Sequence, residues 1–205
     1  MSLSTYQLKP RFQQLLRPML ASLERNGITP NQVTLATMML SLAYGAVLAA
    51  TPRTTAVWLG LPFVLLLRMS LNAIDGMLAT ATGNHTALGA LLNEICDQVS
   101  DAALYLPFAL ATGILAPLVV LVVVAALLVE FAGVLAPTIG TARRFDGPMG
   151  KSDRAFAFSM LALMLGLGAT PVWCNGLLAL VLTLAGLTIL NRLRRALRAC
   201  GQGTR

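Results

Sequence analysis

The chain has 205 residues, of which 57% are hydrophobic and 11% are charged, and its mean hydropathy is +0.75. This composition excludes a soluble globular protein of this size and indicates a polytopic helical membrane protein. The formal net charge of +7 does not imply nucleic acid as a partner, because Lys and Arg facing anionic lipid headgroups explain it and no aromatic–basic readout surface accompanies it.

The first predicted element is an amphipathic helix over residues 8–25. Its apolar side chains recur at helical spacing among basic residues, and they are Phe12, Leu15, Leu16, Met19, Leu20 and Leu23. Pro18 interrupts this pattern and is expected to kink or divide the helix. A basic amphipathic helix beside membrane spans is expected to lie in the interface on anionic lipid, and packing against a partner is the alternative.

Six membrane spans are expected over residues 31–50, 56–81, 86–112, 114–141, 153–169 and 172–196. Thr29 as N-cap and Pro30 at the first helical position predict where the first span begins. The fold class is therefore an all-α polytopic membrane protein, with residues 1–205 as one domain: an amphipathic segment (1–30) and six spans (31–196). No removable signal peptide is expected, because no small-residue cleavage site follows an apolar run at the start.

The basic residues predict the orientation of the chain. If the N-terminus is cytoplasmic, 13 of the 15 Lys and Arg lie on that side, with Arg53 on the far side and Arg68 inside a span. This positive-inside pattern predicts that both termini are cytoplasmic, in a bacterial inner membrane. Trp58 and Trp173 would then open spans from the far side, as interfacial anchors do.

Spans two and three each carry polar and small residues on one helical face. In span two these residues lie at i, i+4, i+7 and i+11, and in span three they follow at steps of four. They are Arg68, Asn72, Asp75 and Ala79, and Gly89, Asn93, Asp97 and Asp101. A short connection at 82–85 makes the spans antiparallel neighbours, so the two faces can lie opposite each other. Their oxygen donors suit a hard divalent cation such as Mg²⁺ or Mn²⁺ rather than zinc.

The charges inside the predicted spans support a bound cation. The carboxylates are Asp75, Glu94, Asp97, Asp101 and Glu130, against Arg68 alone. Apolar surroundings do not tolerate such a negative excess without metal, protons or water. Protonated carboxylates, or carboxylates that cap loops near the interface, are the alternatives. Arg68 is expected to pair with Asp101 rather than to contact a phosphate.

Small residues accompany the acidic face and allow two interpretations. Gly76, Ala79 and Gly89 would let a bulky ligand approach the backbone closely, as glycines do at nucleotide sites. Close packing of helices through small residues is the competing interpretation.

Over Asn72 to Asp97 the chain reads N-x2-D-G-x2-A-T-x8-G-x3-N-x3-D. It resembles the CDP-alcohol phosphatidyltransferases, whose pattern is D-x2-D-G-x2-A-R-x8-G-x3-D-x3-D. Every spacing is preserved, and the departures are Asn72, Thr80 and Asn93. The six spans, the leading amphipathic segment and the Thr-Pro-Asn entry to the first span extend the resemblance over most of the chain.

The resemblance implies a cytoplasm-facing cavity with one or two divalent ions, Mg²⁺ or Mn²⁺. The implied metal ligands are Asn72, Asp75, Asn93 and Asp97, and Asp97 would also be the general base. The implied contacts to the cytidine diphosphate part of the donor are Gly76, Ala79, Thr80 and Gly89. The two asparagines keep oxygen donors but lower the negative charge, and Thr80 removes an expected arginine that would have met phosphate or base.

The predicted cytoplasmic loop 142–154 is rich in cations. Arg143, Arg144, Lys151 and Arg154 are candidates for binding an acceptor phosphate, as in family members that use glycerol 3-phosphate or inositol phosphate. Charge that only sets topology is the alternative. His85 stands alone in its loop and is predicted to be a surface residue.

The predicted function is transfer of a phosphatidyl group from CDP-diacylglycerol to the hydroxyl of a small polar alcohol, with release of CMP, in phospholipid biosynthesis. A phosphorylated acceptor is preferred, with glycerol 3-phosphate first. A degenerate homologue that binds lipid or nucleotide without turnover is the main alternative, and a membrane transporter is a weaker one. A homodimer is implied by the resemblance alone.

Overall fold

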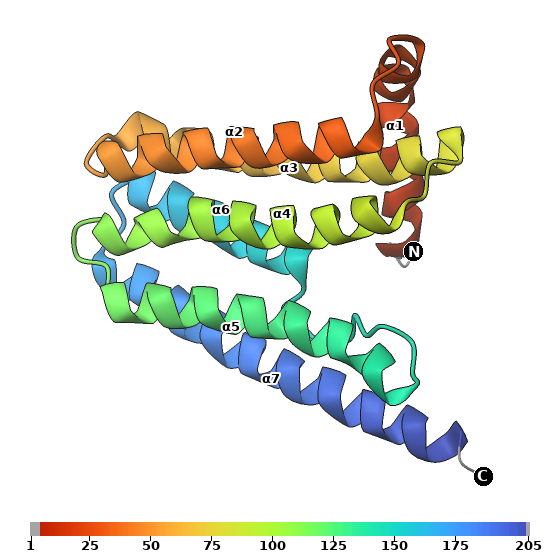
Figure 1. Cartoon of the computed structure of the whole chain (residues 1–205). Coiled ribbons are helices and arrows are strands. Elements are labelled where there is room, and N and C mark those ends of the chain that lie inside the picture. Colours follow the sequence, from red (N-terminus) through yellow and green to blue (C-terminus); the bar gives the residue numbers. More distant parts are fainter. Residues whose placement is uncertain (1–4, 204–205) are drawn as a thin grey trace. The chain divides into compact units, whose positions relative to one another are not determined.

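The computed structural model describes residues 5–203, and side chains are described for residues 14–201. Over this range the chain is helical and contains no strand (Figure 1), which confirms the predicted all-α class. The elements are α1 (Thr5–Arg25), α2 (Pro30–Ala50), α3 (Thr55–Thr82), α4 (Ala87–Tyr105), η1 (Leu106–Leu110), α5 (Ala116–Leu135), η2 (Ala136–Ile139), α6 (Lys151–Gly166) and α7 (Pro171–Gly203).

These helices group into two compact units. Unit 1 comprises Met1–Tyr44 and Val64–Asp101, and unit 2 comprises Gly45–Phe63 and Ala102–Arg205. Unit 1 therefore contains α1, most of α2, the second half of α3 and most of α4, whereas unit 2 contains α5, α6 and α7. The single domain over residues 1–205 stays a prediction.

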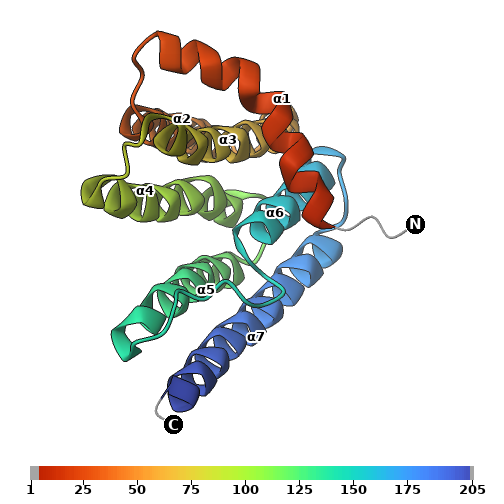
Figure 2. The same cartoon turned by 90° about the vertical axis from the view of Figure 1, so that its right-hand side faces the viewer.

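In unit 1, the amphipathic helix α1 continues past Pro18 and bends along its length (Figure 2). It ends at a glycine turn, where Gly27 has φ +66° and Ile28 N–H donates to the Leu23 carbonyl at 3.0 Å, a hydrogen bond typical of a helix C-cap. Its apolar side chains Leu16, Leu20 and Leu23 pack against a buried cluster of Val33, Ile74 and Leu78. The predicted apolar face thus contacts α2 and α3, while Leu15 stays 78% exposed. The side chains of the predicted Lys9, Arg11 and Phe12 lie outside the described residues.

The first long helix begins where the sequence predicts. Gln32 N–H donates to Thr29 Oγ1 at 3.3 Å, and Thr29 N–H donates to Gln32 Oε1 at 2.9 Å, so the two side chains cap the helix start reciprocally. Pro30 occupies the first helical position of α2. From this point α2, α3 and α4 follow one another as antiparallel helices (Figure 1).

In unit 2, helices α5 and α7 lie side by side (Figure 1). The Trp58 ring lies 4.6 Å from the Phe108 ring at an interplanar angle of 50°, and Phe158 lies parallel to Tyr105 with ring centroids 3.8 Å apart. Trp58 is 3% exposed and its Nε1 donates to the Pro52 carbonyl at 2.8 Å. Its predicted role as an interfacial anchor is therefore wrong, because its ring is buried in this cluster, whereas Trp173 is 71% exposed.

Four helices in the described part of the chain are long and apolar enough to cross a bilayer: Pro30–Ala50, Thr55–Thr82, Ala116–Ile139 and Pro171–Gly201. The protein is thus an integral membrane protein. The two other predicted spans correspond to α4, which carries Glu94, Asp97 and Asp101, and to α6, which has 16 residues. Charge in one and short length in the other explain why they lack the signal of an ordinary span, and the count of six stays a prediction.

Candidate functional site

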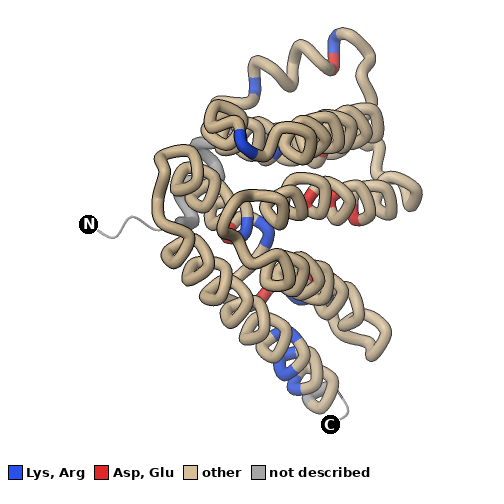
Figure 3. Tube along the Cα trace, turned by 90° about the vertical axis from the view of Figure 1, so that its left-hand side faces the viewer, with Lys and Arg blue, Asp and Glu red and all other residues tan. Residues whose placement is uncertain are grey.

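The predicted polar faces of α3 and α4 meet in unit 1. Asn72 Nδ2 donates a hydrogen bond to Asp97 Oδ1 at 3.0 Å, although 25 residues separate them in the chain. This contact confirms that the short 82–85 connection places the two faces opposite each other. Acidic residues lie within helices of this unit, as Figure 3 shows.

Arg68 closes the deeper end of the same face. Its Nη1 donates to Asp101 Oδ1 at 2.5 Å, its Nη2 donates to the Asp97 carbonyl at 2.9 Å, and the same nitrogen lies 3.6 Å from Asp97 Oδ1. The predicted Arg68–Asp101 ion pair is confirmed. Both side chains are almost fully buried, so the pair neutralises Asp101 where water cannot.

Asp75 is the second buried carboxylate of the site and is 6% exposed. Its Oδ2 accepts a hydrogen bond from Thr34 Oγ1 on α2 at 2.9 Å, and the same hydroxyl lies 3.1 Å from the Pro30 carbonyl. Thr34 is not predictable from the sequence, because its partner lies 41 residues away and the hydrophobic pattern of α2 does not single it out.

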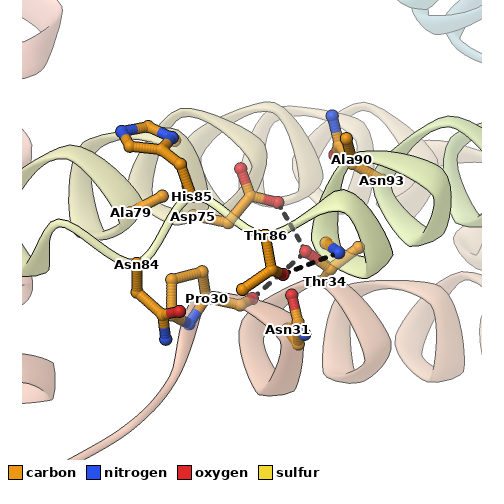
Figure 4. A pocket seen from close by; sticks show the side chains of 12 residues that line it. Pro30, Asn31, Thr34, Asp75, Ala79, Asn84, His85, Thr86, Ala90 and Asn93 are labelled. Atoms are coloured by element: carbon orange, nitrogen blue, oxygen red, sulfur yellow. Dashed lines mark hydrogen bonds between the residues drawn. The ribbon is translucent and has the colours of Figure 1, made fainter.

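A pocket of about 280 Å³ opens beside Asp75, between α2, α3 and the start of α4 (Figure 4). Five predicted site residues line it: Asp75, Gly76, Ala79, Gly89 and Asn93. The other lining residues are Pro30, Asn31, Thr34, Asn84, His85, Thr86 and Ala90. His85 is exposed, as predicted, but it also lies at the rim of this pocket, which its solitary position in the sequence does not reveal.

The two glycines of the motif occupy different surroundings. A Cβ added to Gly76 would meet no heavy atom within 4 Å, so this glycine leaves open space on the surface of α3. A Cβ on Gly89 would lie 2.8 Å from Asn31 Oδ1 and 3.0 Å from Thr86 Oγ1. Of the two interpretations of the small residues, ligand approach therefore suits Gly76, and close packing of helices suits Gly89.

A second ionic cluster lies in unit 2 and is centred on Glu130 of α5. Glu130 accepts hydrogen bonds from Arg154 Nη1 at 3.0 Å and from Arg192 Nη1 at 3.2 Å, and Arg143 Nη2 lies 3.8 Å away. The side chains of Arg154 and Arg192 are 1% and 2% exposed. The charge count that opposed Glu130 with Arg68 alone is thus corrected, because Arg192, counted among the cytoplasmic cations, is buried against this carboxylate.

The four predicted acceptor-phosphate residues are not equivalent in the structure. Arg154 is fully buried against Glu130, whereas Arg143, Arg144 and Lys151 are half-buried. Their loop is held onto α7 at Thr188, whose Oγ1 accepts a hydrogen bond from Met149 N–H at 2.9 Å. A Cβ on Gly147 (φ +125°) would lie 2.5 Å from Thr188, so only glycine fits this close approach.

The comparisons with known proteins show to which family the chain belongs. Residues 27–190 match the family described as CDP-alcohol phosphatidyltransferase. The chain belongs to this family. The Asp75–Asp97 face, the adjoining pocket and the predicted motif all lie inside the matched region. The protein is therefore a transferase of phospholipid biosynthesis in a family that uses CDP-linked donors.

The chain is similar to bacterial proteins, and the part of the chain that each similarity covers differs widely. The chain is 44% identical over 198 residues to the inner membrane protein YnbA of Escherichia coli, covering 95% of this chain and 97% of that protein. It is 31% identical over 109 residues to a phosphatidylinositol phosphate synthase of Mycobacterium marinum, covering 51% of this chain and 43% of that enzyme.

The fold also matches solved structures of the phosphatidylinositol phosphate synthase of Mycobacterium tuberculosis. The structure with CDP-DAG bound aligns with a TM-score of 0.74 at 20% identity, covering 89% of this chain and 94% of that one. The structure in complex with manganese and citrate aligns with a TM-score of 0.72 at 20% identity, covering 87% of each chain. At this identity the likeness shows the fold alone.

The donor atoms of the site fit the divalent metal that this phosphatidyltransferase family uses. The predicted ligands, the carboxylates of Asp75 and Asp97 and the amides of Asn72 and Asn93, would offer hard oxygen atoms. Among the described residues no three His, Cys, Asp or Glu side chains form a metal-binding group. The set is therefore mixed and carries less negative charge than four carboxylates would. In addition, Asn72 directs its amide nitrogen at Asp97 and so links α3 and α4.

Proposed function

We propose that this protein transfers a phosphatidyl group from CDP-diacylglycerol to the hydroxyl of a small polar alcohol and releases CMP. The observation that carries the proposal is a pair of carboxylates on facing helices, buried Asp75 and half-buried Asp97, with Asp75 lining a pocket of about 280 Å³. Carboxylates at this depth in a helical membrane protein are costly unless they serve a ligand. Membership of the family supports this use of the site.

Asp97 is the proposed general base. It would take the proton of the acceptor hydroxyl while the acceptor oxygen forms a new bond to the phosphorus next to diacylglycerol. The bond from that phosphorus to the oxygen of CMP breaks, and CMP leaves with its negative charge. Arg68 and Asn72 both contact Asp97 and hold its carboxylate on the α3 side, as a base that acts at a fixed position requires.

Binding of the donor is assigned to the remaining residues of the face. Asn72, Asp75, Asn93 and Asp97 would hold Mg²⁺ or Mn²⁺, which when bound neutralises the charge of the donor diphosphate. Gly76, Ala79, Thr80 and Gly89 would border the cytidine diphosphate. The open space above Gly76 supports a close approach of this ligand to the α3 backbone.

A phosphorylated acceptor is the favoured substrate. The half-buried loop cations Arg143, Arg144 and Lys151 could bind a phosphate through charge-assisted hydrogen bonds, whereas the fourth predicted cation, Arg154, is already engaged by Glu130. Glycerol 3-phosphate and an inositol phosphate are the two candidates, and the names of several relatives, phosphatidylinositol phosphate synthases, favour the second.

The proposed location is the bacterial inner membrane, with both termini in the cytoplasm. The name of the relative that covers almost the whole chain supports this location. The concentration of Lys and Arg toward the C-terminal end of α7 supports the orientation (Figure 3). A homodimer remains an expectation from the family resemblance.

The test is release of CMP by the purified full chain in detergent or nanodiscs. CDP-diacylglycerol is supplied with Mn²⁺ or Mg²⁺ and, in separate reactions, glycerol 3-phosphate, inositol phosphate, or serine as an unphosphorylated acceptor. Release that depends on both the metal and one acceptor, with a lipid product of matching mass, is the expected result. No CMP with any acceptor under conditions in which a known family enzyme is active contradicts the proposal.

The hydrogen bond from Asn72 to Asp97 favours a second candidate, a homologue that binds the nucleotide lipid without turnover. The Asn72 amide donates this hydrogen bond to Asp97 Oδ1, so that this carboxylate oxygen is engaged and is less available to a metal ion or to the proton of an acceptor. The two candidates separate in the same experiment, because a binding protein retains radiolabelled CDP-diacylglycerol but releases no CMP. The triple variant Asn72→Asp/Thr80→Arg/Asn93→Asp would then release CMP if the site has lost activity only through these three changes.

A further inference from the structure

A second groove lies on an adjoining face of the motif helix within unit 1. It has a volume of about 610 Å³ and is lined by α1 through Arg17 and Leu20 and by α3 through Asn72, Ala73, Gly76, Met77, Thr80 and Ala81. This volume falls in the range that holds a lipid headgroup or a small organic ligand. Both helices that form it are packed together through the Val33–Ile74–Leu78 cluster, so its walls are fixed.

The groove is amphipathic. Leu20, Met77 and the two alanines give it apolar walls, and among its described lining residues Arg17 carries the charge. Arg17 is exposed and forms no ion pair with any described side chain. An apolar wall with an available guanidinium matches a ligand that has an anionic phosphate next to an acyl chain.

The groove and the pocket beside Asp75 share one residue. Gly76 lines both, and a Cβ at this position would meet nothing within 4 Å, so the backbone of α3 is open to a ligand there. Asn72, the partner of Asp97, lines the groove as well. A single ligand can therefore extend over Gly76 from the pocket into the groove.

Thr80 is uncharged and contributes no cation to this groove. Its hydroxyl donates a hydrogen bond to the Gly76 carbonyl at 2.9 Å, so its hydrogen is already used within the helix. The family pattern has arginine at this position. Arg17 and Thr80 line the same groove from two helices, so α1 brings a guanidinium to a groove that position 80 of α3 borders without one.

We propose that Arg17 binds a phosphate of the lipid donor in this groove and does so in place of an arginine at position 80. The acyl chains of the donor then lie along Leu20 and Met77. The inference rests on the proposed function, because it assumes that the donor is a CDP-linked lipid. The same anchoring also gives α1 a part in substrate binding, beyond its contact with the membrane.

The experiment compares Arg17→Gln with Arg25→Gln and with the double variant Arg17→Gln/Thr80→Arg. Arg25 is an exposed cation at the end of the same helix, and its Nε bonds only the Ala21 carbonyl of its own turn, so it controls for loss of charge at the membrane surface. Affinity for CDP-diacylglycerol is measured in nanodiscs of neutral lipid by titration with a fluorescent analogue, alongside CMP release.

Arg17→Gln is expected to weaken binding of CDP-diacylglycerol by about tenfold, which corresponds to about 1.4 kcal/mol. Arg25→Gln should bind like the wild type, and the double variant should recover most of the loss. Equal binding by Arg17→Gln and the wild type overturns the inference, as does equal loss in Arg25→Gln or no recovery by Thr80→Arg. If the wild type itself neither binds CDP-diacylglycerol nor releases CMP, the proposed function fails first and this inference fails with it.

Discussion

The two ionic clusters of this protein differ in the sign of their excess charge. In unit 1, Asp75, Asp97 and Asp101 outnumber Arg68, and Asp75, which is not paired with Arg68, lines a pocket. In unit 2, Arg143, Arg154 and Arg192 outnumber Glu130, and Arg154 and Arg192 are buried and directly hydrogen-bonded to it.

The difference separates a candidate site from a structural cluster. A buried charge requires a partner, and a cluster that finds it inside the protein holds helices together. A cluster whose excess charge faces a pocket finds its partner in a ligand or ion. On this criterion the Asp75–Asp97 face is expected to control turnover, and the Glu130 core is expected to control stability.

The largest expected effect concerns the proposed base. Asp97→Asn keeps the volume of the side chain but removes its ability to take a proton, so CMP release should fall by about 10² to 10⁴-fold. Measurement of initial rates with saturating donor and acceptor checks this, with the melting temperature in detergent as control for folding. Wild-type rates in Asp97→Asn, or in Asp75→Ala, would exclude the assigned catalytic roles.

The matching variant in unit 2 is Glu130→Gln. It leaves Arg154 and Arg192 buried without a counter-charge, and removal of one partner from a buried ion pair costs about 3–5 kcal/mol. We expect a large loss of stability in denaturant unfolding. Glu24→Gln, at an exposed position of α1, should unfold like the wild type. A Glu130→Gln protein as stable as that control would show that the cluster does not hold unit 2 together.

Carboxylates introduced at positions 72 and 93, where the family pattern has Asp, should increase the negative charge of unit 1 and so its difference from unit 2. Asn72→Asp/Asn93→Asp is expected to raise the affinity for Mn²⁺ by about tenfold or more, because each added charge strengthens the attraction for a hard cation. Calorimetric titration and the rise in melting temperature with Mn²⁺ measure this independently of turnover. Asn191→Asp, on an exposed turn of α7, is the control for added negative charge, and an equal gain there would contradict the prediction.

The smallest expected effect separates two glycines. Gly76→Ala should leave the melting temperature unchanged, because the new Cβ meets open space, but should weaken donor binding several-fold by intruding on the ligand. Gly133→Ala in unit 2 should lower the melting temperature, because its Cβ would lie 2.6 Å from the Arg144 carbonyl and 2.9 Å from Arg192 Nη1. Unfolding and binding measured on both variants test the distinction, and destabilised Gly76→Ala would reverse it.

Local features of the chain were predictable because they depend on neighbouring residues. The start of α2 at Thr29–Pro30 follows from capping chemistry, and the polar faces of α3 and α4 follow from spacing at 3.6 residues per turn. Even the Arg68–Asp101 pair was predictable, because a short connection forces two antiparallel helices into register. These features depend on residues that lie close together in the sequence, so the sequence alone is enough to predict them.

Long-range contacts were not predictable in the same way. Nothing in the pattern of α2 predicts that Thr34 meets Asp75, or that Trp58 is buried rather than anchored at an interface. In the sequence Arg192 is one of several C-terminal cations. In the structure it is buried against Glu130, which lies 62 residues earlier in the chain. Such contacts depend on which helix faces pack together, and many pairings satisfy the same hydrophobic periodicity.

The sequence by itself determined the helices, the family motif and the oxygen-rich chemistry of the candidate site, because spacing along one helix is a local property. Only the tertiary structure decided which charges are already neutralised, that Gly76 faces open space and that Arg17 shares a groove with Thr80. The physical reason is that burial and electrostatic balance are properties of atoms brought together from distant parts of the chain.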